Sequence, residues 1–171
     1  CFVVDTLQKN FGGCAGNIAY TMKLLGADPI IVSVLGDDAK EYIAHLERAG
    51  VRTNHVRIIN GKTTSSAYIT TDSDDNQIIA YHRGAGDDSI ETTIADMREP
   101  LDLVLIAPHR KETMVKHARE CITKGVPFVF DPSHELPLFT PEELSDIIGK
   151  AAFFIGNDYE MHLVQEKLGW S

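Results

Sequence analysis

The chain is short of cysteine and of basic residues, and it has no long apolar run. Its 171 residues include 3 cysteines, and 16 Lys and Arg stand against 25 Asp and Glu, which gives a formal net charge of −9. The spacing of the three cysteines indicates neither disulfide pairs nor a metal site. This favours reduced thiols and therefore a cytoplasmic protein. The acidic balance argues against nucleic acid and against an anionic membrane surface as partners.

No apolar stretch approaches the roughly 20 residues of a membrane-spanning helix, and no secretory signal is visible. We therefore expect a protein that does not engage a membrane. The sequence starts at Cys1 rather than at Met and stops at Ser171, directly after a helical pattern. From these two ends we expect a fragment of a longer chain.

A loop rich in glycine stands before the first helical pattern. It reads Gly12-Gly13-Cys14-Ala15-Gly16-Asn17, and an apolar helix over 18–25 follows it. Glycines allow a close backbone approach and positive φ, and the start of a helix offers unpaired amides. An Asn side chain both donates and accepts hydrogen bonds. A tight turn alone seldom needs all these features, so we predict a loop that binds a polar ligand.

Strand and helix patterns alternate along most of the chain. Apolar runs over 29–35, 101–107, 126–130 and 151–155 predict buried strands, and helices are expected over 39–49, 89–97, 111–124 and 158–168. Asp37 and Asp38 are predicted to cap the helix over 39–49. Such alternation with short links predicts a mostly parallel sheet covered by helices. The fold class is therefore α/β.

The alternation of strand and helix patterns is interrupted between residues 51 and 81. Short β-branched segments over 51–59, 63–70 and 77–81 are separated by turn residues at 60–61 and 72–76. We predict a small antiparallel sheet here, with the segment over 1–5 as a further strand. The resulting division is a core over 12–50 and 83–171 and a β lid over 1–11 and 51–82.

Two polar segments come directly after predicted strands, where open α/β sheets bind ligands. Asn157 and Glu160 follow the strand that ends at Ile155 and share one face of a nascent helix. A plain helix cap explains this pair equally well. Asp131 follows the strand over 126–130, and Pro132 after it also fits a simple turn.

The spacing of these motifs resembles the ribokinase-like (PfkB) carbohydrate and nucleoside kinases, over nearly the whole chain. The resemblance implies a three-layer αβα, Rossmann-like core with a small antiparallel β lid. It implies that Gly12, Gly13 and Asn17 bind the hydroxyls of a sugar or ribose. It also implies that Asn157 and Glu160 handle the phosphates of ATP and a Mg²⁺ ion, which Glu160 holds through water, with Asp131 near the phosphate path.

The tetrapeptide Gly84-Ala85-Gly86-Asp87 has the same sequence as the family's catalytic motif but lies at a different position in the chain. The family's motif comes after Asn-x-x-Glu, whereas this one comes before it. We therefore predict that Asp87 is not the catalytic base, and the resemblance puts that Asp beyond Ser171. His82 and Gly84, where the lid meets the core, are predicted to contact the substrate.

The resemblance implies phosphotransfer from ATP to a hydroxymethyl group, with a nucleoside, adenosine first, as the acceptor. A ribokinase- or fructokinase-type sugar kinase stays open, as does a kinase-like protein that binds a sugar or nucleoside without catalysis. A dinucleotide-dependent oxidoreductase fits poorly, because the glycine spacing and the acidic partner are wrong for it. Exposed lid edges predict pairing between subunits, so a homodimer is an open expectation.

Overall fold

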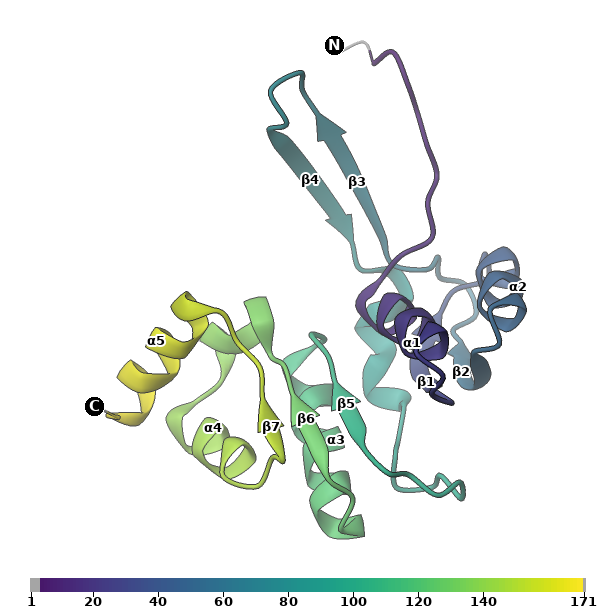
Figure 1. Cartoon of the computed structure of the whole chain (residues 1–171). Helices are drawn as coiled ribbons and strands as arrows, with labels where there is room; N and C mark the ends of the chain where they lie inside the picture. Colours follow the sequence, from purple (N-terminus) through teal and green to yellow (C-terminus); the bar gives the residue numbers. More distant parts are fainter. Residues whose placement is uncertain (1–3, 171) are drawn as a thin grey trace.

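The computed structural model of the protein describes residues 4–170 and shows an α/β core from which a two-stranded hairpin projects (Figure 1). Within these residues, no helix has both the length and the apolar character needed to cross a membrane. The elements in chain order are α1 (Cys14–Leu24), β1 (Ile30–Leu35), α2 (Lys40–Arg48), β2 (Arg52–Ile58), β3 (Ser66–Thr71), β4 (Gln77–His82), the 3₁₀ helix η1 (Gly84–Glu91), β5 (Val104–Ile106), α3 (Lys111–Lys124), β6 (Phe128–Phe130), the 3₁₀ helix η2 (Ser133–Leu138), α4 (Pro141–Ile148), β7 (Phe153–Phe154) and α5 (Asp158–Leu168).

The core contains two parallel sheets. Strands β5, β6 and β7 form one of them, and β1 and β2 form the other. Each parallel connection passes through a helix, as parallel pairing requires. The carboxyl ends of β5, β6 and β7 all reach the edge from which the hairpin projects (Figure 1). The α/β class predicted from the alternating pattern is confirmed.

Helices cover the sheets because apolar side chains alternate along the strands. On β1, Ile31 packs with α1 and α2, while Ile30 and Val32 pack against the larger cluster beneath the second sheet. That larger cluster joins α3, α4, α5 and η2 to β5 and β6, and Phe128 and Phe130 are fully buried in it. Burying side chains of this size is the main source of stability in such a layer.

Strand β2 corrects the expected lid. The pattern over 51–59 predicted an antiparallel lid strand, but β2 pairs in parallel with β1, from Arg52 beside Ile30 to Ile58 beside Leu35. Val51 is buried against α1 and α2, which ties this segment to the core. The turn at Asn60 and Gly61 is present, but it ends a strand of the core rather than joining two antiparallel lid strands. The antiparallel part is the hairpin alone.

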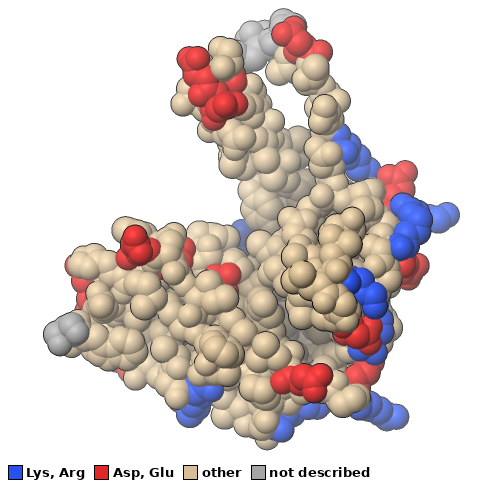
Figure 2. Space-filling model, in the orientation of Figure 1, with Lys and Arg blue, Asp and Glu red and all other residues tan. Residues whose placement is uncertain are grey.

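Residues 1–3 of the expected first lid strand lie outside the described residues, and residues 4–11 form no strand. The hairpin pairs β3 with β4 from Ser66 opposite His82 to Thr71 opposite Gln77. Asp72 closes its turn by accepting hydrogen bonds from the backbone of Asp74 and Asn76. Acidic side chains gather at this tip (Figure 2).

Asp37 and Asp38 do not cap the following helix, and this is a second correction. Asp37 accepts from the backbone N–H of Gly61 at 2.7 Å, and Asp38 accepts from that of Thr64 at 2.7 Å. Helix α2 starts at Lys40 with no side-chain cap. The two carboxylates thus attach the segment before β3 to the end of β1, and the Thr64 hydrogen bonds lower the pKa of Asp38.

The helix expected over 89–97 is also corrected. The structure has the 3₁₀ helix η1, which ends at Glu91, and an irregular segment from Thr92 to β5. Thr92 Oγ1 donates to the carbonyl of Ser89 at 2.7 Å, while Ser89 Oγ lies 2.9 Å from Thr113 Oγ1 on α3. These side chains are used to pack η1 on α3 rather than to cap a new α-helix.

Candidate active site

The glycine loop is held at its backbone by α2. Gly13 precedes α1 with φ of 89°, a conformation that favours glycine. The hydroxyl of Tyr42 on α2 donates to the carbonyl oxygen of Gly12 at 2.5 Å. A side chain at Gly16 would collide with the same hydroxyl. The loop is therefore fixed in place before any ligand arrives.

Asn17 lies on the first turn of α1 with an exposed side chain, and its backbone N–H bonds to the carbonyl of Gly13 at 3.0 Å. Phe11, just before the glycine loop, stacks on Tyr42, with ring centroids 5.4 Å apart. Its ring also lies 4.8 Å from that of His45. Phe11 thus packs the loop onto α2, while the exposed side-chain amide of Asn17 stays accessible for hydrogen bonding.

His82 and Gly84 lie where the hairpin joins the core. Nε2 of His82 is 3.1 Å from Oγ1 of Thr63. Gly84 has φ of 50°, and a Cβ there would collide with the carbonyl of Thr63. The next amide, that of Ala85, donates to this carbonyl at 2.8 Å. Close packing of two backbone segments thus requires the glycine, whatever ligand it contacts.

Asp87 lies on η1 with an exposed side chain, and Arg110 Nη1 donates to its carbonyl oxygen at 2.8 Å. The tetrapeptide over 84–87 is therefore the first turn of a 3₁₀ helix that packs on α3.

Asn157 and Glu160 form a reciprocal helix cap at the start of α5. The side chain of Asn157 accepts from the Glu160 N–H at 2.9 Å, and Glu160 Oε2 accepts from the Asn157 N–H at 2.9 Å. This is a capping box, which fixes both side chains at the helix start. The cap uses Oε2 of Glu160 and leaves the charge of the carboxylate at the carboxyl end of β7.

Asp131 lies beside Glu160, although 29 positions separate them in the sequence. Burial raises the pKa of Asp131, and the negative charge of Glu160 raises it further. Strands β6 and β7 are neighbours in the sheet, so the residues after them meet at one edge. Ser133 follows with φ of 42°, a strained conformation for a residue with a side chain. Tertiary structure thus brings together two carboxylates that the sequence only suggested separately.

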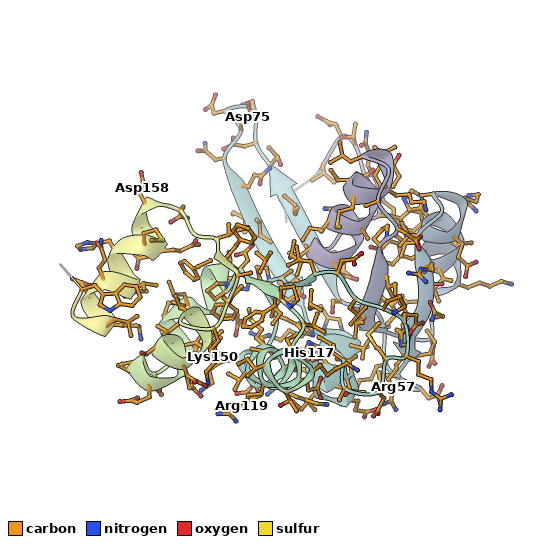
Figure 3. All side chains as sticks on the ribbon, turned by 60° about the horizontal axis from the view of Figure 1, so that its bottom comes forward. Arg57, Asp75, His117, Arg119, Lys150 and Asp158 are labelled. Carbon is orange, nitrogen blue, oxygen red and sulfur yellow. The ribbon has the colours of Figure 1, made fainter. Side chains whose placement is uncertain are left out.

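The start of α1, the junction of the hairpin and the start of α5 lie along the same edge of the molecule (Figure 1). Seen from another side, Asp158 at the start of α5 and Asp75 at the hairpin tip again lie along one edge, while Lys150 and Arg119 lie at the opposite one (Figure 3). Asp131 and Glu160 follow the neighbouring strands β6 and β7, close enough for the charge of Glu160 to raise the pKa of Asp131, whereas the glycine loop reaches the edge from the other parallel sheet.

His109 is a residue of this edge that the sequence reading missed. It lies three residues after the end of β5, and its place after a predicted strand was the available signal. Burial lowers the pKa of His109 to about 4, and the positive charges of His117, Arg110 and Arg83 add to the shift. His109 is therefore neutral at pH 7 and presents an uncharged imidazole near the carboxyl ends of the strands.

This pKa predicts an acid-sensitive fold. The unfolded-state value for His is near 6.5, so the unfolded chain binds the proton first as the pH falls. The contribution of His109 to the free energy of unfolding is fully present above about pH 6.5. It declines toward pH 4, by on the order of 3 kcal/mol for a shift of this size. Urea unfolding between pH 4 and pH 8 should show a shallower decline for His109→Gln than for the wild type. Equal slopes for the two proteins would contradict this assignment.

Among residues 4–170, no group of three or more His, Cys, Asp or Glu side chains could hold a metal ion by itself. The carboxylates of Asp131 and Glu160 are nevertheless of the type that Mg²⁺ prefers. This ion commonly keeps several waters and takes only one or two protein carboxylates. The edge could thus contribute to a magnesium site whose remaining ligands are waters and phosphate oxygens.

Comparisons with known proteins agree with this architecture. The family model described as pfkB family carbohydrate kinase matches residues 3–171. The nucleoside kinase of Burkholderia thailandensis, solved in complex with inosine, is 40% identical with a TM-score of 0.89, and the match covers 100% of this chain and 56% of that one. The Methanocaldococcus jannaschii nucleoside kinase, described as an archaeal member of the ribokinase family, is 27% identical with a TM-score of 0.87, over 98% of this chain and 56% of that one.

A curated relative, the nucleoside kinase of Methanothermobacter thermautotrophicus, is 28% identical over 168 residues, which is 96% of this chain and 54% of the relative. The chain thus spans about half the length of the proteins it matches. The ribokinase-like fold expected from the glycine loop and the Asn-x-x-Glu segment is confirmed. Because the family model covers nearly every residue, this chain belongs to the pfkB family of carbohydrate kinases.

Proposed function

We propose that the protein transfers a phosphoryl group from ATP to the hydroxymethyl group of a nucleoside, with adenosine as the first candidate. One observation carries the proposal: the glycine loop, the hairpin junction and the paired carboxylates of Asp131 and Glu160 lie along one edge of the sheets. Relatives named as nucleoside kinases support a nucleoside rather than a free sugar as the acceptor.

In this proposal the glycine loop binds the acceptor. The backbone at Gly12 and Gly13 allows close approach, and the amide of Asn17 hydrogen-bonds the ribose hydroxyls. His82 and Gly84 contact the acceptor from the hairpin side. Because Tyr42 holds the loop before binding, little ordering entropy is lost when the acceptor enters. Such preorganisation places the reacting hydroxyl without reorganisation of the backbone.

Asn157, Glu160 and Asp131 form the phosphate side of the proposed site. When bound there, Mg²⁺ neutralises charge on the phosphates of ATP. Glu160 would hold the ion through a water ligand, and Asn157 fixes Glu160 through the capping box. Burial raises the pKa of Asp131, and the like charge of Glu160, which a cation would relieve, raises it further. The residues present therefore fit the ion.

We assign the removal of the acceptor proton to an Asp outside the described residues rather than to Asp87. The exposed apolar side chains of the hairpin, among them Ile69 and Ile79, support a second copy of the hairpin as a partner in a homodimer. We further propose that the enzyme works in the cytoplasm, where ATP is available and where its free thiols stay reduced.

Acceptor preference tests the proposal directly. The full-length protein, supplied with ATP and Mg²⁺, is assayed for ADP release with adenosine, inosine, ribose and fructose 6-phosphate. We expect kcat/KM for a nucleoside to exceed that for either sugar by at least about 100-fold, because buried polar groups left unpaired by a smaller acceptor weaken binding. Turnover restricted to a sugar would overturn the nucleoside assignment, and ADP release independent of any acceptor would overturn the kinase proposal.

A further inference from the structure

Glu135 is a buried carboxylate that the proposed mechanism does not use. It lies on η2, after β6, and its side chain is only 7% exposed. Two cationic or titratable groups face it: Arg83 Nη2 lies 3.7 Å from its Oε1, and His134 Nε2 lies 3.7 Å from the same oxygen. His134 is itself largely exposed. A charge in such a place is costly unless it is paired, so Arg83 is the partner that stabilises it.

Arg83 belongs to the acceptor side of the proposed site. It stands between His82 and Gly84, at the junction of hairpin and core, and its carbonyl accepts from Ser65 Oγ at 2.6 Å. Its positive charge also contributes to the lowered pKa of His109, which follows β5. The side chain thus reaches from the hairpin junction to η2.

Glu135 belongs to the phosphate side. The chain runs from Asp131 through Pro132, which is fully buried, and Ser133, with its strained φ of 42°, directly into η2. The N–H of Asp131 donates to the carbonyl of Ile106 at 3.0 Å, and that of Glu135 donates to the carbonyl of Pro132 at 3.0 Å. These backbone hydrogen bonds tie Asp131 and Glu135 into one short segment after β6.

We propose that the ion pair between Arg83 and Glu135 couples the acceptor side of the site to its phosphate side, so that binding of the nucleoside strengthens binding of the nucleotide. This inference rests on the proposed function. Arg83 and Glu135 are positioning residues: Arg83 fixes the junction that carries His82 and Gly84, and Glu135 fixes the loop that carries Asp131. Coupling of this kind is reciprocal between the two ligands.

The chain offers a matched control pair. Lys62, in the loop between β2 and β3, pairs with Asp88 on η1. Removing Lys62 disturbs an ion pair whose carboxylate is more exposed than Glu135 and does not cut the connection to η2. Lys62→Gln should therefore change stability without changing the coupling.

Calorimetric titration of the full-length protein measures the coupling. The Kd of ADP with Mg²⁺ is determined with and without saturating adenosine, and the ratio of the two values gives the coupling. We expect a ratio of at least about fivefold in the wild type, falling to about one in Arg83→Gln and in Glu135→Gln. The double variant should match the single ones, and Arg83→Lys should retain part of the coupling. A role in folding alone would lower the melting temperature and leave the ratio unchanged.

The outcomes separate the two proposals. If the wild type binds both ligands and the ratio survives in Arg83→Gln and Glu135→Gln, or is already one in the wild type, the coupling inference is overturned and the kinase proposal stands. If Lys62→Gln abolishes the ratio as well, the effect does not belong to the Arg83–Glu135 pair and the inference also falls. If the wild type binds neither adenosine nor a sugar, the proposed function itself fails.

Discussion

Replacing Glu160 by Gln should lower kcat by about 100-fold while leaving the melting temperature of the full-length protein nearly unchanged. Glutamine serves at the third position of a capping box as well as glutamate does, so the hydrogen bond to the N–H of Asn157 is retained. What disappears is the negative charge of Glu160, near Asp131. In the proposed site this charge would orient a water ligand of Mg²⁺. Loss of a residue that acts on a metal through its ligands commonly costs 10- to 100-fold. Steady-state kinetics over a range of Mg²⁺ concentrations and thermal unfolding measure the two effects.

Glu160→Ala is the matched comparison. It removes both the charge and the hydrogen bond that Oε2 of Glu160 accepts from the Asn157 N–H, and one such bond contributes about 1 kcal/mol. We expect the activity of Glu160→Ala to resemble that of Glu160→Gln and its stability to be lower. If Glu160→Gln kept full activity and only Glu160→Ala was impaired, Glu160 would be a helix cap and nothing more.

The second large effect is expected at Asn17, on the acceptor side. Asn17→Ala should raise KM for the nucleoside by about 10- to 100-fold, because the bound acceptor loses a hydrogen-bonding partner in a desolvated site. Asn17 is exposed on α1, and alanine is the better helix former, so the free energy of unfolding should not fall. Steady-state kinetics at saturating ATP gives the KM for the nucleoside.

Thr21→Ala is the control for this variant. Thr21 lies one turn further along α1, also exposed, and outside the glycine loop. It should leave KM for the nucleoside unchanged. An unaltered KM in Asn17→Ala would remove the glycine loop from the acceptor site, and an equal rise in Thr21→Ala would show a general disturbance of the helix.

Elements whose ends carry local signals could be predicted from the sequence. Helix α3 has the bounds expected for it, because Gly125 adopts φ of 68° directly after Lys124 and ends the helix. The apolar runs after Gly125 and before Gly156 form strands of a parallel sheet, shorter than the patterns suggested. In each case the residues that determine the element lie in it or only a few positions away in the sequence.

Elements that depend on distant partners could not be predicted in this way. β2 shows the alternating pattern of a lid strand, yet burial of Val51 against α1 and α2 places it beside β1. Asp37 and Asp38 have the form of a helix cap but bond to Gly61 and Thr64, more than 20 residues away. Each carboxylate could accept either from the N–H groups at the start of the next helix or from N–H groups of a distant segment. It bonds to the distant ones because tertiary packing brings them close, and a short-range sequence pattern contains no information about them.

By itself, the sequence determined the local chemistry of the site: a glycine loop at a helix start, an Asn and a Glu at another, and strands that must be buried between helices. Hydrogen bonds within a few residues and apolar periodicity are sufficient for these features. Only the tertiary structure decided which groups meet, namely Asp131 with Glu160 and Arg83 with Glu135. These contacts depend on which strands are neighbours, and that is set by the burial of the whole core rather than by any one segment.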